Sequence, residues 1–332
     1  MSELLKVENL SKYFPVRGGL LRRARKQLKA VDDVSFSIAR GRTLGLVGES
    51  GCGKSTLGRA IIRLLEPTAG TVALEGTRIT ELTRRELFER RRDMQIIFQD
   101  PYASLSPRRT VGQTLLEPLE THRMMTPARR RDWLLELLEI VGLREHILTR
   151  YPHEFSGGQR QRVGIARALT LKPKFIVADE AVSALDVSVQ SQVLNLLRKL
   201  QREFGISFLF ISHDLAVVQH ISDEVGVMYL GKIVEMTSAS RLFARPLHPY
   251  TEALMSAVPV PDPARKSSRI VLQGDVPSPI DPPGGCPFHT RCPRVMEVCR
   301  VTPPPTVNAG STEAPHFVNC HLFPVPNTEE DV

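Results

Sequence analysis

Residues 48–56 read Gly-Glu-Ser-Gly-Cys-Gly-Lys-Ser-Thr and follow an apolar run, Thr43–Val47, that is typical of a buried strand. A helical run over residues 57–65 comes directly after them. This is the G-x-x-x-x-G-K-S pattern, in the strand and helix context that it requires. Glycines let the backbone curl so that successive N–H groups point at phosphate oxygens, and the following helix adds its positive end. The flanking elements disfavour the alternative, a glycine-rich turn with a chance lysine.

The loop therefore predicts a nucleoside triphosphate site. Lys54 is expected to reach the β and γ phosphates, and Ser55 to place its hydroxyl on Mg²⁺. The predicted nucleotide contacts in this loop are Gly48, Glu49, Ser50, Gly51, Cys52, Gly53, Lys54, Ser55 and Thr56.

Further strand-like runs at Phe175–Ala178 and Ser207–Ile211 alternate with helical patterns, which predicts a largely parallel sheet covered by helices. The fold class is therefore α/β, of the P-loop NTPase type. A helical pattern from Pro127 to Val141 lies in a predicted helical insert over about 100–160. Most of the 25 prolines lie from Pro246 onward, which indicates a loop-rich C-terminal tail.

The run Phe175–Ala178 ends in two acids, Asp179 and Glu180. A carboxylate at the tip of a buried strand is costly unless it meets a cation, so Asp179 is the predicted partner of Mg²⁺. Glu180 could orient and deprotonate the attacking water. Taken alone, two acids after a strand are also compatible with a structural role.

Between these motifs stands Ser156-Gly157-Gly158-Gln159, followed by an apolar helix. Ser156 and Gln159 fit a capping box, which marks the start of a helix. Two glycines before a helix also leave N–H groups open to a phosphate, so this segment is a second candidate anion site. Two such sites on one chain favour a dimer that closes over nucleotide.

In this order and spacing, the motifs resemble the ATP-binding subunit of an ABC transporter over about residues 1–240. The resemblance implies that Ser156 and Gly158 act on a nucleotide bound by the partner protomer. It also implies roles for Gln99 as a Mg²⁺ ligand and sensor, for Asp186 in the loop after the acids, and for His213 as a γ-phosphate sensor. A lone histidine at that place could equally be structural. Tyr13 is placed to stack on adenine, with Phe14 as the alternative.

Three segments indicate the oligopeptide and dipeptide importer branch of that family: residues 99–107, 179–186 and 248–252. The resemblance implies an ATPase that powers peptide uptake from the cytoplasmic face of the inner membrane, as a peripheral subunit. Its expected partners are two transmembrane permease subunits, a second homologous ATPase and, indirectly, a substrate-binding protein. Nickel or another small solute is an alternative cargo, and a soluble ABC ATPase outside transport is an alternative function.

Residues 241–332 form the predicted C-terminal region, which contains four of the five cysteines: Cys286, Cys292, Cys299 and Cys320. Their spacing matches neither a standard zinc ribbon nor the common ferredoxin runs. The resemblance implies a four-iron four-sulfur cluster. The alternatives are zinc, with His289, His316 or His321 replacing a thiolate, and uncoordinated thiols.

The chain has 332 residues, a formal net charge of +8 and basic clusters such as Arg22–Lys26 and Arg90–Arg92. No aromatic residues are interleaved with these clusters, so we expect solvated faces and no nucleic-acid partner. The first ten residues lack the apolar core of a signal peptide, and no stretch reaches the length of a membrane span. We therefore expect a cytoplasmic chain that depends on other subunits to cross the bilayer.

Overall fold

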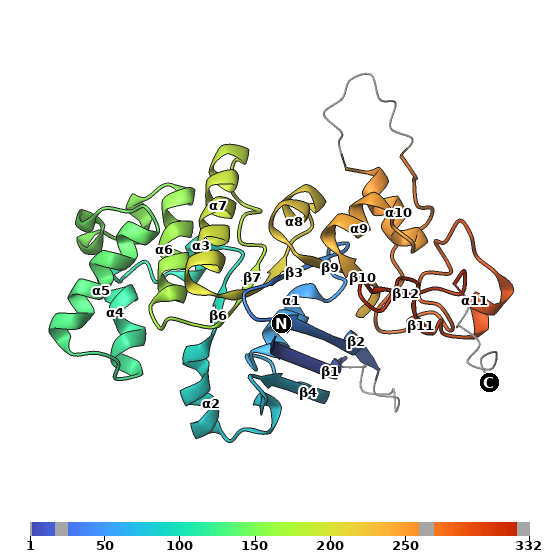
Figure 1. The fold of residues 1–332 in the computed structure, drawn as a ribbon, viewed down its shortest axis with the longest axis horizontal. Coiled ribbons are helices and arrows are strands. Elements are labelled where there is room, and N and C mark those ends of the chain that lie inside the picture. The colour runs from blue at the N-terminus through green and yellow to red at the C-terminus, as the bar shows by residue number, and fades with distance from the viewer. Residues whose placement is uncertain (1, 17–25, 259–268, 324–332) are drawn as a thin grey trace.

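The computed structural model describes residues 2–16, 26–258 and 269–323. Part of the basic segment noted above, at 17–25, lies outside the described residues. The predicted α/β class is confirmed: helices surround two separate sheets (Figure 1). Among the described residues, no helix has both the length and the apolar character needed to span a bilayer.

The larger sheet has eight strands in the order β11-β12-β10-β9-β3-β8-β7-β6. Strands β9, β3, β8, β7 and β6 pair in parallel, whereas β9, β10, β12 and β11 pair antiparallel. The strands are β3 (Thr43–Val47), β6 (Met94–Ile97), β7 (Phe175–Asp179), β8 (Ser207–Ile211), β9 (Glu224–Tyr229), β10 (Lys232–Ser238), β11 (Thr306–Asn308) and β12 (His316–Asn319).

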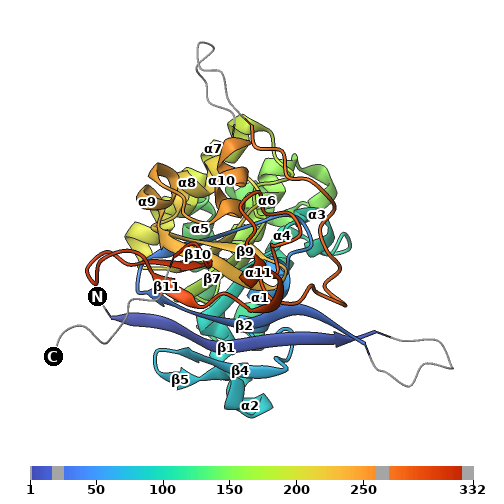
Figure 2. The same cartoon turned by 90° about the vertical axis from the view of Figure 1, so that its right-hand side faces the viewer.

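The smaller sheet is antiparallel, in the order β2-β1-β4-β5, and lies below the larger one in Figure 2. Its strands are β1 (Glu3–Pro15), β2 (Gln27–Ala39), β4 (Ala69–Leu74) and β5 (Thr77–Arg78). Helix α1 (Lys54–Ile61) contacts strands of both sheets, β1 and β2 on one side and β7 and β8 on the other. Gly58 permits this approach, because a Cβ there would lie 2.8 Å from a methyl of Val177.

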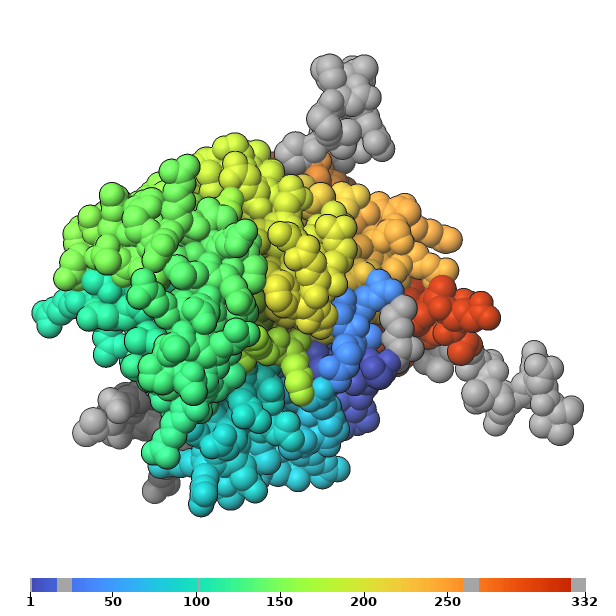
Figure 3. Space-filling model, turned by 60° about the vertical axis from the view of Figure 1, so that its left-hand side comes forward, coloured from blue at the N-terminus to red at the C-terminus, as the bar shows by residue number. Residues whose placement is uncertain are grey.

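The remaining helices cover the sheets. They are α2 (Arg84–Arg90), α3 (Pro101–Ser104), α4 (Val111–Thr121), α5 (Pro127–Ile140), α6 (Gly157–Leu169), α7 (Val187–Phe204), α8 (Leu215–Ile221), α9 (Ala239–Ala244), α10 (Pro249–Ser256) and α11 (Glu297–Val301). Helices α3 to α6 form one side of the molecule, green in Figure 3, and the C-terminal region lies on the opposite side.

The apolar runs recognised in the sequence are the buried centre of the sheet, since every residue of β3, β7 and β8 is buried. Helix α5 matches its predicted pattern and buries Leu134, Leu137 and Leu138. The helix expected over 57–65 is different: it begins at Lys54 and ends at Ile61. Its end has a local cause, because Arg63 adopts a left-handed conformation with φ of 50° and cannot continue the helix.

The C-terminal segment extends the larger sheet: β12 pairs with β10 through Glu235, Met236 and Thr237. Glu235, which is buried, accepts hydrogen bonds from the backbone N–H groups of Leu247 and His248 and lies 2.7 Å from His316 Nε2. Residues from two parts of the tail thus meet at one carboxylate of β10, which fixes the tail to the sheet.

Candidate functional site

The carboxyl ends of the parallel strands bring the predicted nucleotide residues together. The phosphate loop follows β3, Gln99 follows β6, Asp179 ends β7, and His213 follows β8. Since these strands are neighbours that run in the same direction, their loops meet at one edge of the sheet, where ligands of open α/β sheets bind.

Two glycines let the phosphate loop pack against its neighbours. Gly48 has φ of 151°, and a Cβ there would lie 2.1 Å from the backbone oxygen of Met228 on β9. Gly53 has φ of 108°, and a Cβ there would lie 1.9 Å from the backbone oxygen of Ala30 on β2. No other residue type can occupy either position without displacing a backbone.

Lys54 begins α1, is buried, and folds back over the loop. Its ammonium donates to the backbone oxygens of Gly48 at 2.7 Å and Glu49 at 3.0 Å, and lies 3.7 Å from Cys52 Sγ. Burial raises the pKa of the Cys52 thiol, so the thiol stays protonated at neutral pH and adds no charge beside Lys54.

Asp179 is 1% exposed, and its carboxylate is satisfied by two residues of α1. The hydroxyl of Ser55 donates to Asp179 Oδ1 at 2.6 Å, and Arg59 donates to Oδ2 at 3.3 Å. The sequence indicated the first contact but not the second. A hydroxyl and a carboxylate converging in this way are the oxygen donors that Mg²⁺ prefers.

Glu180 lies next to Gln99 and His213. Gln99 Nε2 donates to Glu180 Oε2 at 2.8 Å, and His213 Nδ1 lies 3.4 Å from Oε1. Glu180 has an unusual positive φ of 48°, and its N–H is held by the backbone oxygen of Ile211 at 3.0 Å. The strand end therefore turns the glutamate side chain toward the loop after β8.

Ser156 caps helix α6 through the predicted capping box, since Gln159 N–H donates to Ser156 Oγ at 3.4 Å and Ser156 N–H donates to Gln159 Oε1 at 3.1 Å. Gly158 packs against the next helix, because a Cβ there would lie 2.5 Å from Val189 on α7. Asp186 caps α7, and hydrogen bonding from Ser188 lowers the pKa of its carboxyl. No hydrogen bond described above joins these two helix starts to Lys54, Asp179 or Glu180.

Tyr13 lies on β1, in the smaller sheet, where its hydroxyl donates to Asp32. The ammonium of Lys29 lies 5.6 Å from the centre of its ring. Burial, followed by the bond to Asp32, raises the pKa of this phenol. The phenol group is thus anchored within the hairpin, which leaves base stacking a prediction.

Sequence reasoning missed a connection between the phosphate loop and the tail. Arg291 donates to both carboxylate oxygens of Glu49, at 2.7 and 3.0 Å, and the hydroxyl of Tyr250 accepts the Glu49 N–H at 2.9 Å. Tyr250 and Arg291 are each more than 200 positions from Glu49 in the chain, so no local sequence pattern predicts the contact.

The four tail cysteines are largely buried and close enough to influence one another. Burial raises the pKa of Cys286 to about 11, and the neighbouring thiols of Cys299, Cys320 and Cys292 add to the rise. The backbone joins two of them directly, since Cys286 N–H donates to the Cys299 oxygen at 2.8 Å. Within the described ranges, however, no three His, Cys, Asp or Glu side chains form a ready metal-holding group.

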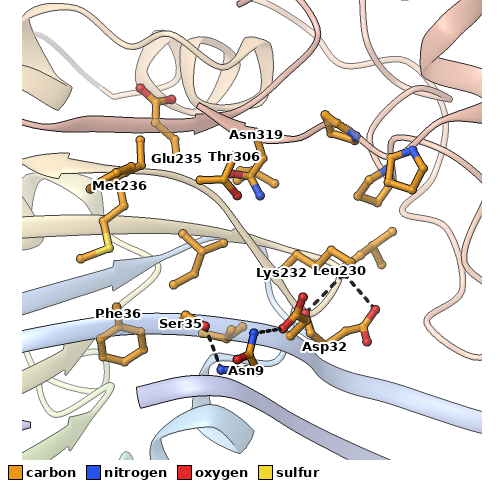
Figure 4. Close-up of a pocket in the computed structure, with 18 of the residues that line it drawn as sticks. Asn9, Asp32, Ser35, Phe36, Leu230, Lys232, Glu235, Met236, Thr306 and Asn319 are labelled. Carbon is orange, nitrogen blue, oxygen red and sulfur yellow. Dashed lines mark hydrogen bonds and ion pairs between the residues drawn. The ribbon is translucent and has the colours of Figure 1, made fainter. Parts of the chain in front are cut away.

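A cavity of about 1150 Å³ lies between the β1–β2 hairpin and the tail, and Figure 4 shows Asn9 and Asp32 on one side of it and Glu235 and Asn319 on the other. None of the phosphate-loop residues lines it. This cavity is therefore distinct from the residues gathered at the strand ends, and we do not assign the nucleotide to it.

Comparison with known proteins adds independent findings. Residues 31–183 match the ABC transporter family, and residues 234–299 match the oligopeptide/dipeptide transporter C-terminal region. The chain is 54% identical over 323 residues to the oligopeptide transport ATP-binding protein AppF of Bacillus subtilis, covering 96% of this chain and 97% of AppF. It is also 54% identical to a probable peptide ABC transporter ATP-binding protein, y4tS, of Sinorhizobium fredii, covering 96% of this chain and 90% of that protein.

The solved structures that this chain resembles belong to the same family of ATP-binding proteins. The ATP-binding cassette MJ0796, a dimer in a post-hydrolysis state with ADP and Pi, superposes with a TM-score of 0.63 at 30% identity, covering 71% of this chain and 99% of MJ0796. The cbiO1 protein of Clostridium perfringens, part of the ABC transporter complex cbiONQ, gives a TM-score of 0.63 at 28% identity over 74% of this chain and 92% of cbiO1.

The packing of the phosphate loop predicts a contrast between two glycines with positive φ. Gly53→Ala forces a Cβ into the Ala30 backbone and should lower the free energy of unfolding by about 3 kcal/mol or more. Gly51→Ala has open space and should cost only the left-handed strain of about 1 to 2 kcal/mol. Urea unfolding of both variants measures the difference, and equal losses would contradict the packing argument.

Proposed function

This chain belongs to the ABC transporter ATPase family, in the oligopeptide and dipeptide branch, and we propose how its residues divide the work of powering peptide import. The chain is the ATP-hydrolysing subunit of a peptide importer. The observation that carries the division of roles is that three residues at the strand ends have separate polar partners. Lys54 bonds to the Gly48 oxygen, Asp179 to Ser55 and Glu180 to Gln99, and each residue serves a different part of one reaction.

Binding of ATP is the task of the loop. Lys54 is held by carbonyls of its own loop, and we propose that it exchanges them for the β and γ phosphates when ATP binds. Ser55 and Asp179 would hold Mg²⁺, which neutralises phosphate charge when bound. The loop glycines and the residues from Ser50 to Thr56 supply the surrounding N–H groups.

Hydrolysis needs a base that can take a proton from water. Glu180 is the proposed base. It directly follows Asp179, and each of its two carboxylate oxygens contacts a different residue, Gln99 or His213. Gln99 and His213 hold its two oxygens in this state, so a nucleotide that draws either residue away would release the carboxylate for catalysis. His213 is the proposed γ-phosphate sensor, and Gln99 the sensor that faces the helical insert.

The start of helix α6 is proposed to act in a dimer. Ser156, Gly157 and Gly158 lie at the N-terminus of α6, where Ser156 and Gly157 are exposed, which suits this end to meet a phosphate bound by another subunit. MJ0796, a structural relative, is a dimer with ADP and Pi. The partner proposed here is a second homologous ATPase, either a paralogue or a second copy.

The role of Glu180 is testable by Glu180→Gln, which keeps the shape of the side chain and removes the base. Turnover of ATP should fall at least a hundredfold while ATP is retained and a closed dimer is stabilised. Steady-state ATPase assays and size-exclusion chromatography with ATP measure both effects. The matched control is Glu203→Gln on α7, an exposed glutamate that pairs with Lys199. Full activity in Glu180→Gln would contradict the assignment of the base.

An ABC ATPase of this branch works with membrane permeases, and we propose two permease subunits, docked at the cytoplasmic face of the inner membrane. A hollow of about 640 Å³ beside the helical insert is the proposed docking place, because it borders α3, the segment that follows Gln99. Most of its lining side chains are polar, and the charged ones are mostly basic. They include Arg91, Gln95, Ser104, Arg109, Glu117 and Arg167.

Affinity capture from detergent-solubilised native membranes tests the partners. Mass spectrometry should find two polytopic permease subunits and a second ATPase, and the eluate should hydrolyse ATP. A substrate-binding protein is expected only indirectly. Recovery of ribosomal or DNA-repair proteins without a polytopic subunit would overturn this partner set, and the solutes that stimulate the eluate would separate peptides from nickel or another small solute.

The tail cysteines are proposed to hold a four-iron four-sulfur cluster, with zinc as the alternative. Support comes from the mutual proximity of four thiols, three buried and that of Cys292 partly buried, although their side chains have to rearrange to make a ligand set. Anaerobically purified protein should contain iron and acid-labile sulfide, and Cys299→Ser should lose both. Zinc without sulfide would establish the alternative, and the absence of both metals would contradict metal binding.

A further inference from the structure

The phosphate loop carries an acidic residue, Glu49, directly after Gly48. A carboxylate there is electrostatically unfavourable, because the loop exists to bind a polyanion and like charges repel. The residue is also partly screened from water, with a side chain 29% exposed. Something must therefore compensate its charge, and that partner comes from the far end of the chain.

Arg291 is that partner. Its guanidinium makes a two-pronged pair with Glu49, at 2.7 and 3.0 Å, and its side chain is only 8% exposed. Such forked pairs fix geometry as well as charge. The guanidinium also lies 6.0 Å from the ring of Tyr229 at the end of β9, the strand that packs against Gly48.

The tail holds the backbone of the same residue. The Glu49 N–H donates to the hydroxyl of Tyr250 on α10, whose ring is fully buried and packs on Tyr229 with 4.7 Å between centres. Phe288 closes this aromatic cluster, 5.2 Å from Tyr229 and 5.4 Å from Tyr250. Both anchors of Glu49 therefore rest on one packed cluster.

The carbonyl of Glu49 points the other way and accepts a hydrogen bond from Lys54 at 3.0 Å. The residue that the tail fixes is thus one of the two that hold the phosphate-binding lysine in place. We propose that Arg291 is a positioning residue for ATP binding: it neutralises Glu49 and fixes the phosphate loop from the C-terminal region. This inference rests on the nucleotide site proposed above and assigns the tail a part in it.

The test is a rescue experiment on the full-length chain. Arg291→Gln leaves Glu49 uncompensated and should raise the KM for ATP about tenfold, with a smaller effect on kcat and a larger effect at low salt. Glu49→Gln in the same background removes the repelling charge and should restore the KM to within about threefold. Arg291→Lys keeps the charge without the fork and should fall between the wild type and Arg291→Gln.

The matched control is Arg294→Gln, which removes a neighbouring ion pair with Glu252 that does not touch the loop. Its KM for ATP should stay within twofold of wild type. If Arg291→Gln only lowers the Tm, or if Glu49→Gln fails to restore the KM, the positioning role is wrong. A wild-type chain that binds no ATP would instead overturn the proposed function itself.

Discussion

The phosphate loop packs tightly between the backbones of two strands, and the rest of the site depends on this packing. Gly48 touches the end of β9, in the large sheet, and Gly53 touches β2, in the small one. The loop is also bonded to the turn after β9, since Gly231 N–H donates to the Cys52 oxygen at 2.9 Å. The curve that presents N–H groups to phosphate is therefore set by tertiary packing and not by the loop alone.

From that fixed loop the remaining polar groups take their places through strand order. Parallel strands deliver Asp179, Glu180, Gln99 and His213 to the edge where the loop ends. Burying Asp179 would be costly without partners, and Ser55 and Arg59 supply them from the helix that the loop begins. The same contact therefore satisfies a buried charge and leaves a hydroxyl and a carboxylate together for a divalent cation.

The sequence was informative wherever a residue's surroundings are local. Apolar runs such as Phe175–Ala178 predict strands because burial on both faces removes alternation. The end of α1 was misjudged because apolar residues continue to Leu65 while the backbone turns at Arg63. The contact of Arg291 with Glu49 left no signal, since 242 positions separate them and only the folded aromatic cluster brings them together.

That contact changes how the tail relates to the nucleotide site. A carboxylate in an anion-binding loop repels the anion. Arg291 offsets this repulsion, because its guanidinium pairs with the Glu49 carboxylate. Tyr250 plays the same part for the backbone, because its hydroxyl accepts the Glu49 N–H. Strand β12, paired to β10, ties this region into the sheet that carries the loop. The C-terminal region therefore contacts the phosphate loop directly, and changes around its cysteines can reach that loop through Arg291, the residue that precedes Cys292.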